Sequence, residues 1–246
     1  KMLKTDFPKP FPVISYSDAI EKYGSDKPDL RFEMELSYLE DLAKGKGFKV
    51  FDESESIVAI SVPGAAEYSR KKLDELTNWV KRPQIGARGL VYVKYNEDQT
   101  FKSSVDKFYD ASHLKQWSEK CGASPGDLLL ILSGKKSDIQ YQMNELRLLI
   151  GSRLGLRDPK VFKPVWVVDF PLLEKDETSN SFHAMHHPFT SPKTSDLSIL
   201  ESNPENVRAN AYDLAINGVE VGGGSIRIPG REVEEKMLQI LGFGKE

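Results

Sequence analysis

Residues 217–228, with the sequence NGVEVGGGSIRI, constrain the fold more than any other part of the chain. Asn-Gly between two segments of alternating polarity is typical of a type I′ hairpin turn, whose two central residues both need positive φ angles. Asn217 and Gly218 are therefore expected to join two antiparallel strands, predicted over residues 209–216 and 219–228. One face of the incoming strand carries Tyr212, Leu214 and Ile216.

Three consecutive glycines, Gly222, Gly223 and Gly224, lie inside the outgoing strand. Glycine weakens a strand interior and usually marks a bulge or a place where another group comes close to the backbone. The spacing alone leaves two interpretations open. Either a flat or charged ligand lies on the glycines, or they admit side chains of the sheet itself. We expect a close approach to the backbone at all three.

Two charged residues flank the glycines. Arg227 presents a planar set of donors that suits a carboxylate or phosphate, and Glu220 offers an acceptor for a metal ion or a hydroxyl. The two residues are seven positions apart, so in a regular strand their side chains would point to opposite faces. One extra residue would restore a common face, and we therefore predict a bulge or kink within residues 222–224.

A small α/β domain with its own core is predicted over residues 44–134. Strands are expected at residues 50–53, 57–62, 89–95 and 126–134, and amphipathic helices at residues 69–81 and 112–120. Few contacts with the flanking segments are expected. Five cations, which suit either a solvated face or an RNA-binding face, are Lys71, Lys72, Lys81, Arg82 and Arg88.

The flanking segments, residues 1–43 and 135–246, have less regular patterns. They predict an extended lead-in over residues 1–12, helices over residues 17–23 and 137–154, and a core strand over residues 163–171. Ser17 is expected to cap the first helix and Gly24 to end it. Gly155 is expected to end the second helix.

Composition excludes several classes of protein. The net charge of −3 argues against a nucleic-acid-binding surface over the whole chain, although a local basic face is compatible with it. No stretch reaches the roughly 18 apolar residues of a membrane span, and no leader is recognisable, so a cytoplasmic protein is expected. The single Cys121 predicts a buried structural thiol. His183, His186 and His187 lack an established ligand spacing, so no metal site is expected there.

Three segments resemble one family. EVGGGSIRI (residues 220–228) resembles the glycine-rich strand of class II aminoacyl-tRNA synthetases of the aspartate type. FHAMHHPFTSP (residues 182–192) resembles the histidine loop of the bacterial aspartyl-tRNA synthetases, and YGSDKPDLRF (residues 23–32) resembles the segment after their motif 2. The region between these two is similar to the GAD insertion domain of that family.

This resemblance implies an α/β (α+β) fold, in which part of the antiparallel sheet of a class II synthetase carries an inserted small α/β GAD domain. Residues 1–43 and 135–246 would be segments of the catalytic domain, and residues 44–134 would be the insertion.

The resemblance also implies an activity: ATP-dependent activation of aspartate to aspartyl-adenylate, and transfer of aspartate to tRNA(Asp). ATP and Mg²⁺ would be required, and the parent enzyme would be a homodimer. His186 would lie on a mobile loop that closes over aspartate, and Arg227 would bind the β-carboxylate. Glu220 would help to hold ATP, through Mg²⁺ or a ribose hydroxyl, and the three glycines would let substrate lie against the backbone. No residue is assigned a catalytic acid–base role.

The chain departs from the family pattern in one respect. No segment resembles motif 1, the arginine loop of motif 2, motif 3 or the anticodon-binding barrel. We therefore expect an internal segment that forms no aspartyl-adenylate by itself. Two alternatives remain open. One is a GAD-containing subunit of a tRNA-dependent amidotransferase, which would need neither the glycine-rich strand ending in Arg227 nor His186 and His187. The other is a non-catalytic module that binds tRNA or protein.

Overall fold

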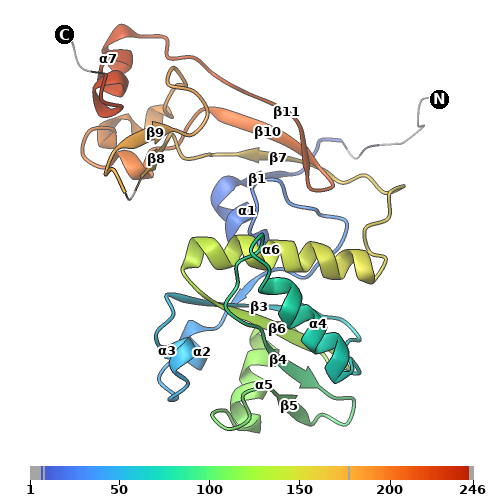
Figure 1. Cartoon of the computed structure of the whole chain (residues 1–246). Coiled ribbons are helices and arrows are strands. Elements are labelled where there is room, and N and C mark those ends of the chain that lie inside the picture. Colours follow the sequence, from blue (N-terminus) through green and yellow to red (C-terminus); the bar gives the residue numbers. More distant parts are fainter. Residues whose placement is uncertain (1–6, 8, 177, 244–246) are drawn as a thin grey trace. The chain divides into compact units, whose positions relative to one another are not determined.

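The computed structural model describes Phe7, residues 9–176 and residues 178–243. Most of the expected lead-in over residues 1–12 lies outside the described residues. The chain forms two compact units, which we call unit 1 and unit 2. Unit 1 consists of residues 1–19, 26–30 and 160–246, and unit 2 of residues 20–25 and 31–159. Figure 1 labels the elements of both units.

Unit 1 contains a four-stranded sheet in the order β1-β7-β10-β11. Its strands are β1 (Val13–Ser15), β7 (Pro164–Val168), β10 (Ala211–Ile216) and β11 (Val219–Ser225). β1 runs parallel to β7, whereas the β7–β10 and β10–β11 pairs are antiparallel. The other elements are the hairpin of β8 (Leu173–Lys175) and β9 (Phe182–Ala184), the 3₁₀ helices η1 (Thr194–Ile199) and η2 (Pro204–Asn206), and α7 (Arg231–Ile240).

The core of unit 1 lies on one face of this sheet. Alternate residues of the two central strands are buried there, namely Val165, Val167, Ala211 and Ala215. Side chains from the following loops and from α7 complete the same cluster, including Phe170, Leu173, Leu200 and Met237. Tyr212, on the opposite face, is 43% exposed. The buried face of β10 is therefore built from small residues rather than from its large apolar ones.

Unit 2 contains a five-stranded antiparallel sheet in the order β2-β3-β6-β4-β5. Its strands are β2 (Ser37–Tyr38), β3 (Ser56–Val62), β4 (Val91–Tyr95), β5 (Phe101–Ser103) and β6 (Leu128–Gly134). Its helices are α2 (Glu40–Ala43), α3 (Lys49–Asp52), α4 (Arg70–Val80), α5 (Ala111–Lys120) and α6 (Lys136–Arg153). The helix α1 (Tyr16–Tyr23) begins in unit 1 and ends in unit 2.

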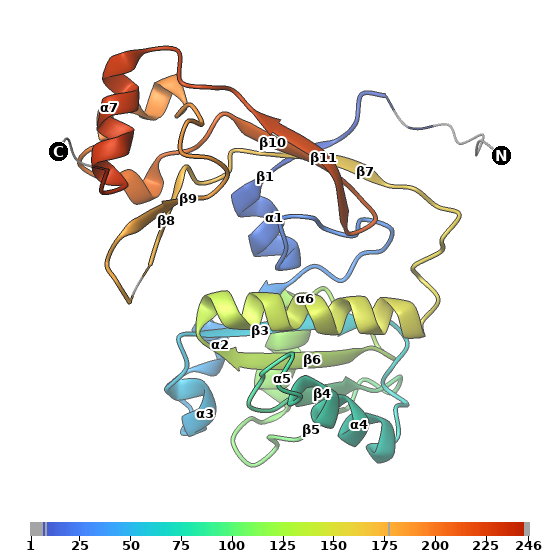
Figure 2. The same ribbon diagram turned by 45° about the horizontal axis from the view of Figure 1, so that its top comes forward.

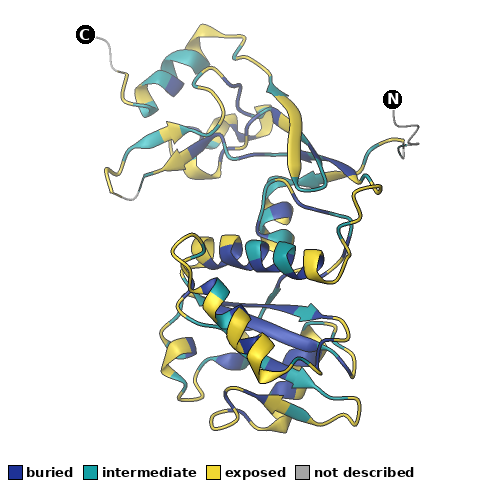
Figure 3. Ribbon diagram, turned by 45° about the vertical axis from the view of Figure 1, so that its right-hand side comes forward, coloured by how far each residue is buried: buried dark blue, intermediate teal, exposed yellow. Residues whose placement is uncertain are grey.

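Helices cover both faces of the sheet of unit 2, as Figures 1 and 2 show. The apolar residues of β3 and β6 at even-numbered positions share a core with α4 and α6, and those at odd-numbered positions share a core with α2, α3 and α5. Because successive side chains of a strand point to opposite faces, the continuous apolar sequence of β6 supplies buried side chains to both cores. Figure 3 shows these two central strands mostly in the colour of buried residues.

Unit 2 extends beyond the boundaries expected for the inserted domain, residues 44–134. Phe32, Met34 and Leu36 precede that range, and α6 follows it, yet all of them contribute to the cluster that contains β3 and β6. The sequence places α6 in the flanking segment of residues 135–246, but its apolar side chains cover the sheet of unit 2.

Arg147 of α6 is fully buried and fixes the segment that precedes β2. Its guanidinium donates hydrogen bonds to the carbonyl oxygens of Met34 at 3.1 Å, Phe32 at 2.8 Å and Glu33 at 2.9 Å. The same guanidinium lies over the Phe32 ring at 4.1 Å. A buried cation is tolerated here because carbonyl dipoles and an aromatic face replace its hydration.

Three local predictions were wrong. Residues 50–53 were expected to be a strand, but the first three belong to α3 and Glu53 caps its end, because Val50 is 52% exposed and only Phe51 reaches the core. Ser15 rather than Ser17 caps α1, since the amide of Asp18 donates to its hydroxyl at 3.0 Å. The outgoing strand ends at Ser225, three residues earlier than expected, where the backbone begins to pair with another loop.

The two glycines expected to end helices were predicted correctly. Gly24 and Gly155, with φ angles of 68° and 70°, follow the ends of α1 and α6. The thiol of Cys121 packs against the core formed with α2, α3 and α5, and burial raises its pKa to about 11, so it is protonated at neutral pH. Among the described residues, no helix is long and apolar enough to cross a membrane.

Candidate active site

The turn between β10 and β11 has the geometry that the Asn-Gly pair predicts. Asn217 has a φ of 56° and Gly218 a φ of 85°, as a type I′ turn requires. The Asn217 side chain also accepts a hydrogen bond from the amide of Lys163 at 2.9 Å and donates one to the carbonyl of Val161 at 2.7 Å. The hairpin is thus fixed to the segment that enters β7.

Asp213 lies on the buried face of β10, two positions from each of Ala211 and Ala215. Its side chain is only 13% exposed. A carboxylate in such a position loses hydration, which is costly unless other groups compensate. The residue is therefore a candidate for function, and it was not among the residues singled out from the sequence. The sequence signal that could have identified Asp213 is its charge at a core-facing strand position between Ala211 and Ala215.

The glycines make room for side chains of β10. A β-carbon on Gly223 would lie 2.0 Å from Asp213 Oδ1, and one on Gly224 would lie 2.8 Å from the Tyr212 hydroxyl oxygen. A β-carbon built on Gly222 would meet no heavy atom within 4 Å apart from its chain neighbours. At Gly223 and Gly224 the close approach therefore comes from the sheet itself, and only Gly222 leaves open space beside the backbone.

A bulge interrupts the β10–β11 pair at Val221. Leu214 pairs with Gly222, whereas Ala215 pairs with Glu220, so Val221 has no partner in the ladder. Directly opposed residues of an antiparallel pair share a face, and the bulge therefore puts Glu220 on the face of Ala215 and Asp213. The predicted bulge exists, but one residue before the glycines.

Acidic neighbours act on Asp213. Burial is the largest influence and raises the pKa of this carboxyl above its usual value, and the negative charges of Glu220 and Asp26 raise it further. The nearby His186 acts in the opposite direction. A cation beside Asp213 and Glu220 would offset the repulsion between these two carboxylates.

The loop that contains the histidines approaches this carboxylate. His186 Nε2 lies 3.7 Å from Asp213 Oδ2, and its ring packs edge-on against Phe170 at a centroid distance of 4.6 Å. His187 Nδ1 instead accepts a hydrogen bond from the amide of Phe189 at 3.1 Å, and His183 is mostly exposed. In the described part of the chain, no three His, Cys, Asp or Glu side chains are grouped so that they could hold a metal ion.

Arg227 follows the end of β11 and pairs with the end of the same loop. It forms an isolated bridge with Thr190, the amide of Ser191 donates to the carbonyl of Ile226 at 2.7 Å, and the amide of Ile228 donates to that of Phe189 at 3.0 Å. Alternation along the extended backbone from Gly223 assigns Arg227 to the face of Asp213 and Glu220. The residue is exposed, and its side chain has no ion-pair partner among the described residues.

The arrangement combines charged groups of both signs on one face of the sheet, where the core-facing side of β10 meets the exposed edge strand β11. Figure 3 shows most of β11 in the colour of exposed residues, although the strand borders a buried face of β10. A free guanidinium suits an anionic ligand group, and a pair of carboxylates suits a cation or an ammonium group. The site can therefore hold a ligand that carries both signs of charge.

Comparison with known proteins identifies the family. The class II tRNA synthetases (D, K and N) match residues 1–246. The aspartate–tRNA ligase of Flavobacterium psychrophilum is 55% identical over 236 residues, which are 96% of this chain and 40% of that protein. That of Azobacteroides pseudotrichonymphae is 57% identical over 235 residues, again 96% of this chain and 40% of the relative. That of Bacteroides fragilis is 55% identical over 239 residues, 97% of this chain and 41% of the relative.

The chain thus spans about two fifths of the length of the curated relatives that it matches. The match nevertheless covers unit 1 and unit 2 together, and so includes both the histidine loop and the glycine-rich strand. The chain belongs to the class II tRNA synthetases of the aspartate, lysine and asparagine type.

Proposed function

We propose that this chain supplies the aspartate-binding surface, and part of the ATP-binding surface, of an aspartate–tRNA ligase. The observation that carries the proposal is the bulge at Val221, which gives Glu220 the same face as Asp213. The names of the relatives, all aspartate–tRNA ligases, support the choice of substrate.

Arg227 binds the β-carboxylate of aspartate in this proposal. Its exposed guanidinium can donate two parallel hydrogen bonds to a carboxylate. Asparagine would present an amide NH₂ where the arginine needs an acceptor, so the same geometry rejects it. The pairing of the backbone around Arg227 with residues 189–191 supports this role, because it limits where the side chain can reach.

His186 positions the substrate from the loop side. Its contact with Asp213 orients the ring, and the packing against Phe170 restricts its rotation. The imidazole is then available to an aspartate carboxylate. In the activation step the α-carboxylate of aspartate attacks the α-phosphorus of ATP and pyrophosphate leaves. This step depends on orientation and on charge neutralisation more than on proton transfer.

Asp213 and Glu220 are proposed to hold Mg²⁺. The negative charge of Glu220 raises the pKa of Asp213, and this fits a pair of carboxylates that share a divalent cation. Magnesium is commonly bound by one or two carboxylates together with substrate phosphates, and it would neutralise phosphate charge when bound. Glu220 would thereby also contribute to ATP binding, and a ribose hydroxyl remains its alternative partner.

The remaining partners follow from the family. The acceptor is proposed to be tRNA(Asp), the complete enzyme a homodimer, and its location the cytoplasm, where tRNA is charged. Unit 2 is proposed to correspond to the GAD insertion domain, with boundaries wider than residues 44–134.

A chimeric enzyme tests this function. The matched region of the Flavobacterium psychrophilum ligase would be replaced by this chain, and aspartate-dependent exchange of pyrophosphate into ATP would be measured. We expect exchange by the chimera, and a loss in kcat/KM of about 10² to 10⁴ on Arg227→Ala, since two charge-assisted hydrogen bonds contribute about 1.5 to 3 kcal/mol each.

Arg231→Ala is the matched control, because this arginine is exposed on α7 and, among the described residues, forms an ion pair with Glu235 of the same helix alone. It should leave exchange unchanged. A folded chimera without exchange would contradict the proposed function, whereas normal exchange by Arg227→Ala would remove only this residue from the site.

A further inference from the structure

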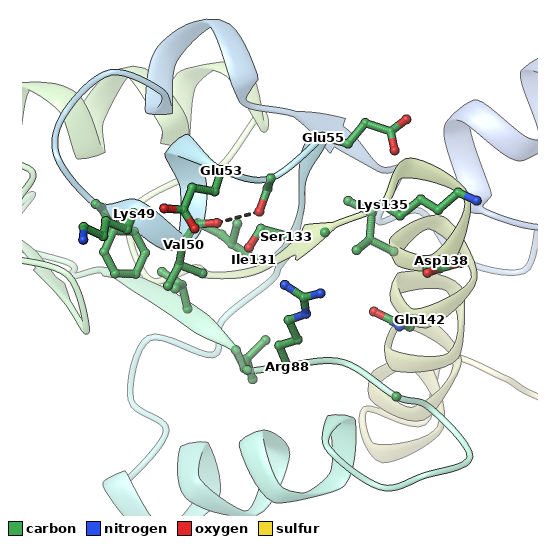
Figure 4. A pocket seen from close by; sticks show the side chains of 18 residues that line it. Lys49, Val50, Glu53, Glu55, Arg88, Ile131, Ser133, Lys135, Asp138 and Gln142 are labelled. Carbon is green, nitrogen blue, oxygen red and sulfur yellow. Dashed lines mark hydrogen bonds between the residues drawn. The ribbon is translucent and has the colours of Figure 1, made fainter.

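Unit 2 contains a cavity of about 650 Å³ that the proposed function does not use. Its lining comes from four places: α3 and the segment after it, the loop before β4, the end of β6 and the first turns of α6. Figure 4 shows the side chains around it. Small-molecule sites in proteins have volumes of about 300 to 1,000 Å³, so this space is large enough for an organic ligand.

Gln142 is the first sign that the cavity is a binding site. This α6 residue is only 9% exposed and lines the cavity. Its carboxamide has no hydrogen-bond partner among the described residues. The carboxamide therefore faces the space of the cavity, where its donor and acceptor are available to a ligand.

Arg88 is the second sign. Figure 4 shows its side chain extending from the loop before β4 into the space between β6 and α6, with Gln142 extending toward the same space from the helix. In the part of the chain that the structure describes, Arg88 has no ion-pair partner. Ser133 of β6 adds a hydroxyl to the lining. A guanidinium, an amide and a hydroxyl together provide donors for an oxyanion.

The other residues that line the cavity indicate the charge and polarity of the rest of the ligand. Apolar side chains line the space between the polar groups, namely Val50, Leu90, Val91, Ile131 and Ile139. Three carboxylates, those of Glu53, Glu55 and Asp138, balance the three cations of the lining, which are Lys49, Arg88 and Lys135. A ligand with several negative charges would therefore meet as much repulsion as attraction. A single oxyanion on an apolar body fits this lining.

We propose that the cavity binds a small organic molecule with one carboxylate or phosphate group, which Arg88 and Gln142 hold, and an apolar part, which lies against Ile131 and Leu90. The simpler interpretation of Arg88 is a solvated cation on a charged surface. It does not explain why Arg88 and the unpartnered carboxamide of Gln142 extend toward one partly apolar cavity. The site belongs to unit 2 alone and does not depend on the function proposed for unit 1.

Two-dimensional ¹H–¹⁵N NMR of the full chain tests the proposal with three probes: phenylacetate, phenyl phosphate and the neutral phenylacetamide. We expect saturable shifts at amides around the cavity, such as Gly86 and Gly134, with the two anions. Arg88→Gln should weaken the binding of both anions about tenfold or more. Gln142→Met, which keeps the size of the side chain, should weaken it severalfold. The comparison of the two anions distinguishes a carboxylate ligand from a phosphate ligand.

Arg82→Gln is the control, because Arg82 is exposed in the same connection before β4 but does not line the cavity. It should bind like the unchanged chain. The proposal is overturned if neither anion gives saturable shifts, if phenylacetamide binds as tightly as phenylacetate, or if Arg88→Gln and Arg82→Gln behave alike. Tighter binding of ATP than of phenyl phosphate at these amides would also overturn it, because the balanced charge of the lining disfavours a polyanion.

Discussion

Gly223 and Asp213 face each other across β10 and β11 so closely that a β-carbon on the glycine would lie 2.0 Å from the carboxylate oxygen Oδ1. No side chain other than a hydrogen atom fits this position unless the carboxylate moves. The glycine therefore determines where the carboxylate lies, and with it the distance from Asp213 to His186. Gly222, one residue earlier, has no such neighbour.

Gly223→Ala should impair catalysis because it displaces the Asp213 carboxylate. In the chimeric ligase we expect kcat/KM for aspartate-dependent pyrophosphate exchange to fall by about 10²-fold, the typical effect of moving a reacting or binding group by about 1 Å. Gly222→Ala is the matched control and should change exchange by less than about twofold, since its β-carbon meets open space. Equal effects of the two substitutions would show that the crowding at Gly223 is irrelevant to the site.

Asp213→Asn should stabilise the chain at neutral pH. The folded-state pKa of Asp213 lies above its usual value, so between these two values the folded chain binds more protons than the unfolded chain. The free energy of unfolding therefore falls as pH rises through this window, and the neutral asparagine avoids the loss. Thermal unfolding should show a Tm advantage of Asp213→Asn that is larger at neutral pH than at about pH 4.

Glu220→Gln removes one of the charges that raise the pKa of Asp213, and it should give a smaller shift of the same sign. A Tm advantage of Asp213→Asn that shrinks as pH rises would contradict the expected direction.

Asn217→Ala should destabilise unit 1 by about 2 kcal/mol. Alanine would have to adopt a φ of 56° and would lose the two hydrogen bonds to Lys163 and Val161. The left-handed conformation costs about 1 to 2 kcal/mol for alanine, which lacks the short polar side chain by which asparagine tolerates it, and each hydrogen bond contributes about 1 kcal/mol or less when it is exposed. Urea unfolding measures the change. Asn217→Gly removes only the hydrogen bonds and should cost about half as much, so a glycine variant as unstable as the alanine variant would argue against backbone strain.

Arg147→Leu should destabilise unit 2 by about 3 kcal/mol or more, because it leaves the carbonyl oxygens of Phe32, Glu33 and Met34 without this donor. Arg153→Leu, an exposed position near the end of the same helix, should stay within about 0.5 kcal/mol of the unchanged chain. The two free energies of unfolding can be compared by urea denaturation. If the losses were equal, the three hydrogen bonds of Arg147 would not hold the segment before β2.

Local signals in the sequence were sufficient for much of the fold. The Asn217-Gly218 turn, the apolar run of β6 and the periodicity of α6 each depend on short-range geometry, and the structure contains all three. The strand predicted at residues 50–53 was wrong because short-range signals do not decide the structure there. Four residues with one buried aromatic, Phe51, fit a strand or a helical turn equally well, and tertiary packing decides between them.

The site was harder to predict because its important relationships are between strands. The alternation of side chains between the two faces of a strand indicated that one extra residue must lie between Glu220 and Arg227. It could not show whether that residue is Val221 or one of the glycines beside it. Asp213 was missed because its neighbours Tyr212 and Leu214 suggested an apolar strand, whereas the face that packs on the core is formed by alanines. Only the pairing register shows that a carboxylate, a bulge and a glycine meet there.

The pairing of Arg227 with Thr190 also limits how the site can be dissected. The loop that carries His186 is joined through residues 189–191 to the backbone on both sides of Arg227. A change that shifts the loop therefore shifts the arginine, and the free-energy effects of replacing the two side chains cannot be independent. Replacing either side chain would therefore also remove part of the free energy that the other side chain contributes. In the proposed site, the histidine and the arginine would therefore bind the substrate as one unit, because the same backbone pairing positions both.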